Sequence, residues 1–116
     1  EAGQARTLEA AHRLARDAVS AQLVARQATP VAGSPGYPPP APITDRTSAI
    51  RWAVEIEQSS AAGYRYLLEC AVRAGGDQAA IRRQGLSGLT DAARAAAYWR
   101  ELVSPDRPTV PFPGAP

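Results

Sequence analysis

The sequence TPVAGSPGYPPPAPI, which spans residues 29–43, decides how this chain folds, because six of its fifteen residues are proline. Proline lacks the backbone N–H and fixes φ, so the segment can form neither the interior of a helix nor a central strand. As a semi-rigid extended chain rising roughly 3.1 Å per residue, it could reach on the order of 45 Å. A helix of some 24 residues is only about 36 Å long. The segment therefore predicts a crossover that runs the length of a helical bundle and makes the helices on either side of it parallel.

The residues before the crossover predict an amphipathic helix over about residues 4–27. At 100° per residue, the following positions fall on one stripe: Leu8, His12, Ala15, Val19 and Leu23. The charged side chains of Arg6, Arg13 and Asp17 point away from this stripe. Thr29-Pro30 is expected to end the helix, because a residue that precedes proline is disfavoured in the helical conformation.

A second helix is predicted over residues 45–74. Thr44-Asp45 supplies good N-capping side chains, and Gly75-Gly76 supplies the residues that commonly end a helix. Its stripe comprises Ile50, Val54, Glu57, Ala61, Tyr64, Leu68 and Val72. Glu57 is the one charged member of this stripe and lies in its middle.

A third helix is predicted over residues 77–103, with Asp77 capping its start. Its stripe comprises Ile81, Gly85, Gly88, Ala92, Ala95, Trp99 and Val103. Gly85 and Gly88 each cost about 1 kcal/mol relative to alanine in a helix. The stripe is nevertheless unbroken, so we expect one continuous helix in which another backbone comes close to both glycines. The alternative is a break between the glycines, with Thr90 capping a new helix.

The residues after the third helix are expected to form an extended tail over residues 104–116. Residues 106–116 contain four prolines and one aromatic residue, Phe112. Proline opposes both helix and central strand, so we expect Phe112 to hold the tail in place.

Composition predicts a single all-α domain over residues 1–116. Alanine supplies 25 of the 116 residues, against one phenylalanine and no methionine. A core built mainly of alanine is thin, so the helices must pack closely or recruit a partner surface. Sustained apolar/polar alternation and the turn dipeptides typical of β-hairpins are absent from the sequence.

Charge and cysteine content exclude several classes of protein. The chain has 13 basic residues, all arginine, and 11 acidic residues, for a net charge of +2. This near balance of charge argues against the clustered basic surface that binds nucleic acid. The single cysteine, Cys70, cannot form an internal disulfide. No apolar run approaches the roughly 20 residues of a membrane span, and no signal-peptide pattern is present. We therefore expect a cytoplasmic protein that binds neither nucleic acid nor membrane.

Two polar residues, His12 and Glu57, interrupt apolar stripes and are the candidates for a site. If the first two helices are parallel, His12 lies roughly 12–14 Å from its helix start and Glu57 about 18 Å from its own, so the two are nearly level. Antiparallel helices would keep them apart. Glu9 precedes His12 by three residues, which gives the Glu-x-x-His spacing of di-iron carboxylate bundles.

These residues support more than one interpretation. Glu9, His12 and Glu57 could bind iron or another divalent metal, but a full di-iron site needs further ligands, and the third stripe offers none at that depth. The alternatives are a hydrogen bond from Glu57 to His12 or Tyr64 in a tight core, and a site completed by another chain.

The sequence contains no residue that we can identify as catalytic. Ser59-Ser60 has no histidine spaced to activate a hydroxyl, and the glycines form no phosphate-binding loop. Cys70 lies off the stripe and is interpreted as an inert thiol. Trp52 and Tyr66 also lie off it, which favours packing or oligomer contacts over cofactor binding.

Several segments resemble an actinobacterial ferritin-like family known only as a domain of unknown function. They are Pro42-Ile43-Thr44-Asp45, Glu57 with Ala61-Ala62-Gly63-Tyr64, Leu89-Thr90-Asp91-Ala92-Ala93, Tyr98-Trp99-Arg100 and Pro111-Phe112-Pro113-Gly114. Ala11-His12-Arg13 and Arg16-Asp17 fit the second helix of that family. The resemblance implies a ferritin-like four-helix bundle and an ability to bind metal. The family's first helix, with its Glu-His pair, has no counterpart here, so we expect the N-terminus of the natural protein to be missing.

Three functions therefore remain open at this point. The first is a non-catalytic interaction or assembly protein, whose groove at the position of the missing helix is filled by a protein partner or by a second copy in a homo-oligomer. The alternative is a metal-binding, iron-type ferritin-like protein that uses an incomplete carboxylate/His site. The third is a carrier of a small ligand in a core pocket lined by Trp99, Tyr64 and the small residues around 85–92.

Overall fold

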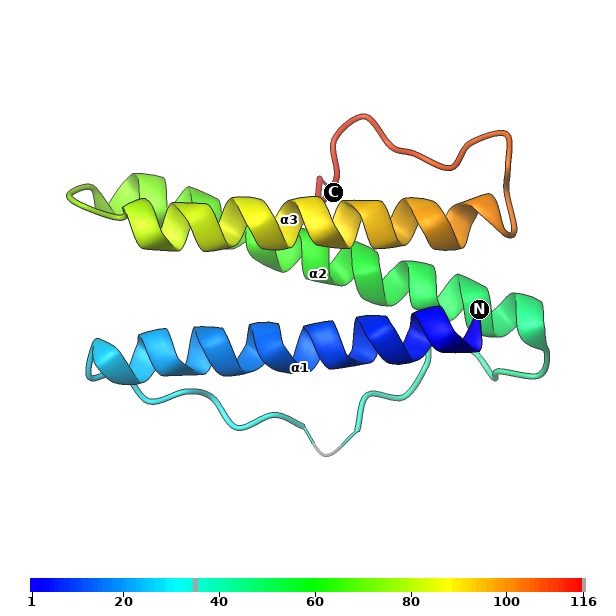
Figure 1. The fold of residues 1–116 in the computed structure, drawn as a ribbon, viewed down its shortest axis with the longest axis horizontal. Coiled ribbons are helices and arrows are strands. Elements are labelled where there is room, and N and C mark those ends of the chain that lie inside the picture. Colours follow the sequence, from blue (N-terminus) through cyan, green and yellow to red (C-terminus); the bar gives the residue numbers. More distant parts are fainter. Residues whose placement is uncertain (35, 116) are drawn as a thin grey trace. The chain divides into compact units, whose positions relative to one another are not determined.

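The computed structural model describes residues 1–34 and 36–115, and over these residues the chain is all-helical, with no strand. The helices are α1 (Ala2–Ala25), α2 (Arg46–Ala74) and α3 (Ala79–Glu101) (Figure 1). Each predicted helix end lies within two residues of the observed one. The prediction of an all-α chain with three helices is confirmed. The chain divides into two compact units, Glu1–Pro38 and Pro39–Pro116.

The first unit contains α1, and its pattern of exposure follows the predicted stripe. The partly covered positions include Leu8, His12, Ala15, Val19 and Leu23. The helix ends before Thr29-Pro30 for a reason that the sequence did not show. Gln27 adopts a left-handed conformation (φ 59°), and the N–H of Ala28 bonds to the carbonyl of Leu23 at 2.9 Å. This hydrogen bond, with that of Gln27 N–H to Val24, forms a Schellman motif that stops the helix.

The described residues of the connector over 29–43 form neither helix nor strand, as its prolines require. Residue 35 lies outside the described residues. The connector joins one unit to the other, so the parallel arrangement of α1 and α2 stays a prediction.

The start of α2 is fixed by a capping box around Asp45, as predicted for this residue. The Asp45 carboxylate accepts a hydrogen bond from Ser48 N–H at 2.7 Å, and Ser48 Oγ accepts one from Asp45 N–H at 3.0 Å. These bonds satisfy backbone donors that have no partner within the helix.

Replacing Asp45 with alanine is expected to lower the Tm at pH 7, and this deficit should shrink in acid. The hydrogen bond from the Ser48 backbone N–H, followed by that from its side chain, lowers the pKa of Asp45 below its ordinary value of 3.8. A lowered folded-state pKa contributes stability above the unfolded pKa and loses it as the pH falls through the folded value. Thermal melts at pH 7 and at roughly pH 2 measure the effect. Asp45→Asn caps without titrating, so its deficit at pH 7 should be smaller than that of Asp45→Ala, and it should shrink in acid by a similar amount. A deficit for Asp45→Ala that is the same at both pH values would contradict the prediction.

Helices α2 and α3 form an antiparallel hairpin in the second unit and lie side by side (Figure 1). The turn between them needs glycine, because Gly75 (φ 66°) and Gly76 (φ 64°) are both left-handed. The carboxylate of Asp77 accepts the N–H of Ala79 at 3.1 Å, but the N-cap of α3 is Gln78, one residue after the predicted position, and its side chain makes no capping hydrogen bond.

Most of the buried positions of α2 and α3 fall on one face of each helix, at spacings built from steps of three and four residues. The buried positions are Ile50, Val54, Glu57, Ala61 and Ala71 on α2, and Gly85, Ala92, Ala95, Ala96 and Trp99 on α3. The predicted stripe was wrong at its end, because Val72 is 68% exposed and Ala71 only 4%. Positions on such a stripe lie about 3.5 residues apart on average, so a step of four residues is followed by a step of three. Because the step before Leu68 is four residues, the next position of the stripe lies three residues after Leu68.

Helix α3 runs unbroken through Gly85 and Gly88, as predicted. The expected approach of another backbone occurs at Gly85, where a Cβ would lie 3.5 Å from the Tyr64 carbonyl oxygen, but side chains of α2 come closest to both glycines. A Cβ on Gly85 would lie 2.8 Å from Leu68 Cγ, and a Cβ on Gly88 would overlap the Tyr64 ring. Leu68 and Tyr64 thus fill the space that these glycines leave, which removes the core pocket expected around residues 85–92.

Candidate functional site

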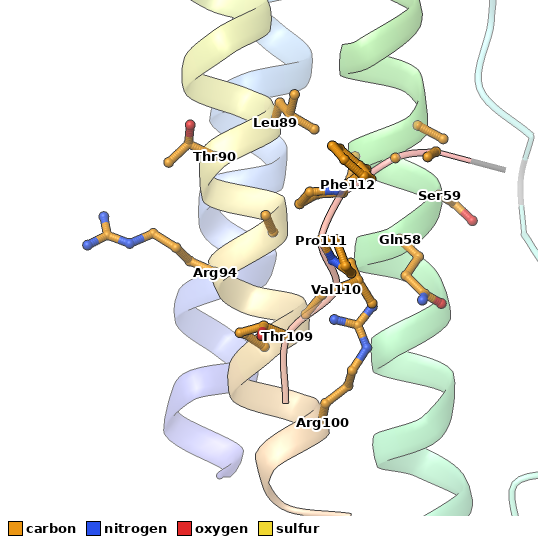
Figure 2. Close-up of a pocket in the computed structure, with 18 residues that line it drawn as sticks. Gln58, Ser59, Leu89, Thr90, Arg94, Arg100, Thr109, Val110, Pro111 and Phe112 are labelled. Carbon is orange, nitrogen blue, oxygen red and sulfur yellow. The ribbon is translucent and has the colours of Figure 1, made fainter. Parts of the chain in front are cut away.

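A pocket of about 940 Å³ lies between α2, α3 and the tail (Figure 2). Small side chains line both helical walls: Ala61 and Ala62 on α2, and Ala93, Ala96 and Ala97 on α3. The tail contributes its residues 109–115. Small side chains on both helices leave a hollow along the hairpin, which the tail covers in part and which stays open to solvent on one side.

The tail reaches this position because it turns back at the end of α3 (Figure 1). The N–H of Ser104 bonds to Arg100 O at 2.6 Å, and the N–H of Arg107 bonds to Ser104 O at 3.1 Å. Arg100 Nη1 then donates to Pro108 O at 3.5 Å. These bonds direct the following residues back along the hairpin.

Gly114, not Phe112, fits the tail closely against α2. Gly114 is left-handed (φ 76°), and a Cβ on it would lie 2.6 Å from the carbonyl oxygen of Ala61. The N–H of Ala115 closes a turn onto Phe112 O at 3.1 Å. Phe112 itself is 76% exposed, so the expectation that its ring holds the tail was wrong.

We expect Gly114→Ala to release the tail from α2. The substitution places a side chain in a left-handed conformation, at a cost of about 1–2 kcal/mol, and drives its Cβ into backbone that cannot move aside. Amide hydrogen exchange should show faster exchange at Ala115, while the amides of α2 and α3 keep their protection. Gly33→Ala is the matched control, because a Cβ at Gly33 meets nothing within 4 Å. Unchanged exchange at Ala115 in the Gly114 variant would contradict this account of the tail.

The charged side chains that line the pocket are both arginines, Arg94 and Arg100. Figure 2 shows the Arg100 side chain extending toward the tail, whereas Arg94 extends away from it. In the part of the chain that the structure describes, no aspartate, glutamate, histidine or cysteine lines the pocket. The helical walls of the pocket therefore combine alanines with the polar side chains of Gln58 and Ser59 on α2 and Thr90 on α3, and the pocket is positive at the end where Arg100 lies.

The predicted metal ligands are divided between the two units. Glu9 and His12 lie on α1, where Glu9 is exposed and forms an ion pair with Arg13. Glu57 lies on α2 and is 3% exposed. No group of three or more histidine, cysteine, aspartate or glutamate side chains that could hold a metal occurs among the described residues. The proposed association of Glu9, His12 and Glu57 stays a prediction.

Glu57 does influence its surroundings on the buried side of α2. The pKa of Tyr64 is raised above 10.0, first by burial and then by the negative charges of Asp91 and Glu57. Tyr64 is the residue whose ring lies against Gly88. Glu57 and Tyr64 are therefore placed by the helix–helix packing, and neither lines the pocket.

The remaining candidates have local structural roles. Ser60 Oγ donates to Ile56 O at 2.9 Å, and Cys70 Sγ accepts a hydrogen bond from Arg73 Nη2 at 3.2 Å. Ser59 lines the pocket, as does Phe112. The sequence reasoning missed Arg100 and the tail as parts of a site. The one available signal was the proline-flanked Phe112 in a segment too rich in proline to form a helix.

Comparison with known structures supports the helical fold. The chain is similar to a conserved hypothetical protein, Rv2844, from Mycobacterium tuberculosis, with 30% sequence identity and a TM-score of 0.72. The match covers 84% of this chain and 70% of that one. No curated protein matches. No helix in the described part of the chain has the length and apolar character needed to cross a membrane.

A family model matches the chain over its whole length. The chain belongs to the family described as "Domain of unknown function (DUF4439)", whose model matches residues 1–116.

Proposed function

We propose that this chain is a non-catalytic interaction protein on a ferritin-like helical scaffold, and that it binds an apolar partner molecule in the pocket between α2, α3 and the tail. The observation that carries the proposal is a half-open hollow of about 940 Å³ whose helical walls include the alanines Ala62, Ala93 and Ala97, beside the polar side chains of Gln58 and Ser59. Pockets that bind small molecules are typically clefts of about 300–1,000 Å³ with mainly apolar linings.

The exposure of the tail supports an apolar occupant. Phe112 is 76% exposed and Val110 is 39% exposed, although both line the pocket. Each Å² of apolar surface removed from water contributes about 25 cal/mol, so an apolar occupant is stabilised by covering these side chains. The lining also lacks the carboxylate, imidazole and thiol groups that general acid–base or nucleophilic catalysis commonly uses. This favours binding over catalysis.

Fluorescence titration with Nile red, an uncharged apolar dye, tests the proposal. We expect saturable binding by the wild type, and a loss of at least about tenfold in affinity for Ala97→Phe, whose ring would occupy the pocket. Ala80→Phe is the matched control, because Ala80 is exposed on α3 and does not line the pocket. Equal affinity in both variants, or no saturable binding by the wild type, would overturn the proposal.

Self-assembly is the second part of the interaction proposal. On α1, Leu14 is 73% exposed and Val24 is 62% exposed, and the helix has no fully buried residue. Large exposed apolar side chains are common at protein interfaces. Light scattering coupled to size exclusion should give a mass above that of one chain. A monomer at all concentrations, with all three helices folded, would contradict assembly.

Metal binding is the alternative function, and the burial of Glu57 is the observation that favours it. A buried carboxylate commonly pairs with a cation or coordinates a metal. The unit that contains Glu57 brings no three suitable ligands together among its described residues, so Glu9 and His12 would have to complete the site. Elemental analysis of protein purified without chelator tests this, with Glu57→Ala for comparison. Sub-stoichiometric metal, or equal metal in both proteins, would exclude the alternative.

A further inference from the structure

We infer that the molecule held in the pocket is an elongated apolar monoanion, and that Arg100 binds its carboxylate. This inference rests on the proposed function, because it names the chemical class of the occupant of the same pocket. The inference assigns Arg100 as the residue that determines specificity. It also assigns a negative charge to the ligand, which the alanine walls alone do not require.

The first argument concerns the hydrogen bonding of Arg100. Its side chain is half-buried, lines the pocket and extends toward the tail (Figure 2). A guanidinium carries five N–H donors. Among the described residues, its one hydrogen bond is that from Nη1 to Pro108 O, which at 3.5 Å is long for an N–H···O bond. Most of its donors therefore remain available to a ligand.

The second argument concerns charge. Among the described residues, no acidic side chain lines the pocket, so none of these lining residues neutralises Arg100. Arginine and a carboxylate form paired, charge-assisted hydrogen bonds in a bidentate geometry. Arg94, the other cation of the lining, extends away from the tail (Figure 2). One inward-facing cation matches one negative charge, which favours a monoanion over a polyphosphate.

The third argument concerns the shape of the apolar part. The α3 wall extends from Leu89 to Arg100, which corresponds to roughly 16 Å at 1.5 Å per residue. Its intervening inward positions are alanines, and the hydroxyl of Thr90 already donates to Leu86 O at 2.8 Å. On the facing wall, α2 contributes Gln58 and Ser59 together with Ala61 and Ala62. A ligand whose charge lies at Arg100 therefore has alanines of α3 along the rest of its length, which suits an unbranched hydrocarbon chain.

Isothermal titration with three probes of equal chain length tests the inference: dodecanoate, 1-dodecanol and dodecylammonium, each below its micelle-forming concentration. We expect dodecanoate to bind at least about tenfold more tightly than dodecanol, as a hydrogen-bonded charge pair implies, and dodecylammonium to bind most weakly. Arg100→Gln should abolish the preference for the acid but leave the affinity for the alcohol within about threefold. Arg100→Lys should keep part of the preference. Arg94→Gln is the matched control and should keep the full preference.

The outcomes separate this inference from the proposed function. If acid and alcohol bind equally well, the pocket binds apolar molecules but the assigned anion is wrong. If the Arg100→Gln variant still binds dodecanoate more tightly than dodecanol, Arg100 is not the anion-binding residue. The same holds if its affinity for both probes falls by the same factor. If the wild type binds none of the three probes, the proposed function fails together with the inference.

Discussion

Replacing Trp99 with alanine is expected to reduce the free energy of unfolding by about 3–5 kcal/mol, the usual cost of removing a buried tryptophan side chain. Trp99 is 5% exposed, and most of the other buried residues of α3 are alanines. Alanine side chains cannot expand into the resulting cavity, so the structure would retain most of it. Its edge-to-face contact with Tyr98, with ring centroids 4.9 Å apart, would be lost as well. Urea denaturation followed by far-UV circular dichroism measures the change.

Trp52→Ala provides the comparison for this prediction. Trp52 is the same residue type, but it lies on α2 away from the buried stripe and is only half-buried. We expect a smaller loss, below about 2 kcal/mol, because less of its surface leaves water on folding. Equal losses for the two variants would show that the buried face of α3 is not where this chain derives its stability.

Much of the helical pattern could be predicted because it depends on neighbours in sequence. The cap at Asp45 and the turn at Gly75-Gly76 use groups within a few residues of one another. The placement of most buried residues on one face of α2 and one face of α3 follows from helix geometry alone. These features locate the helices without any knowledge of tertiary contacts.

The predictions that were wrong concern features that depend on a contact between residues distant in sequence or on an unusual backbone angle. The ring of Tyr64 reaches Gly88 across the hairpin, a contact between residues 24 positions apart that no helical period encodes. The left-handed conformation of Gln27 ends α1 earlier than Thr29-Pro30 would require. A left-handed glutamine is uncommon, and no pattern in the sequence predicts one at this position.

The candidate site was missed for the same physical reason. The fit of Gly114 against the Ala61 carbonyl joins residues that lie 53 positions apart. Sequence reasoning instead selected polar residues on apolar stripes, which identified Glu57 as a buried residue. It could not identify a pocket whose walls are alanines, because an alanine beside a cavity and an alanine in a packed core have the same spacing.

Replacing Gly88 with leucine is expected to reduce the free energy of unfolding by about 2–3 kcal/mol, near the upper end of the usual cost of overpacking. Even a Cβ at this position overlaps the Tyr64 ring, so the larger leucine side chain must displace the ring or separate the helices. Leucine also favours the helical conformation by roughly 0.8 kcal/mol over glycine, which offsets part of the cost. Urea denaturation monitored by circular dichroism measures the net effect.

Gly63→Leu separates the packing cost from the helical preference. A Cβ at Gly63, in the middle of α2, meets nothing within 4 Å, so this variant should gain roughly 0.5–1 kcal/mol. If Tyr64 is the obstruction, Gly88→Leu combined with Tyr64→Ala should lose less stability than the sum of the two single losses, by about 1 kcal/mol or more. Only a close contact between the two helices couples residues 64 and 88. Strict additivity of the two losses, or a Gly88→Leu variant as stable as the wild type, would therefore mean that α3 does not pack continuously against α2 at this point.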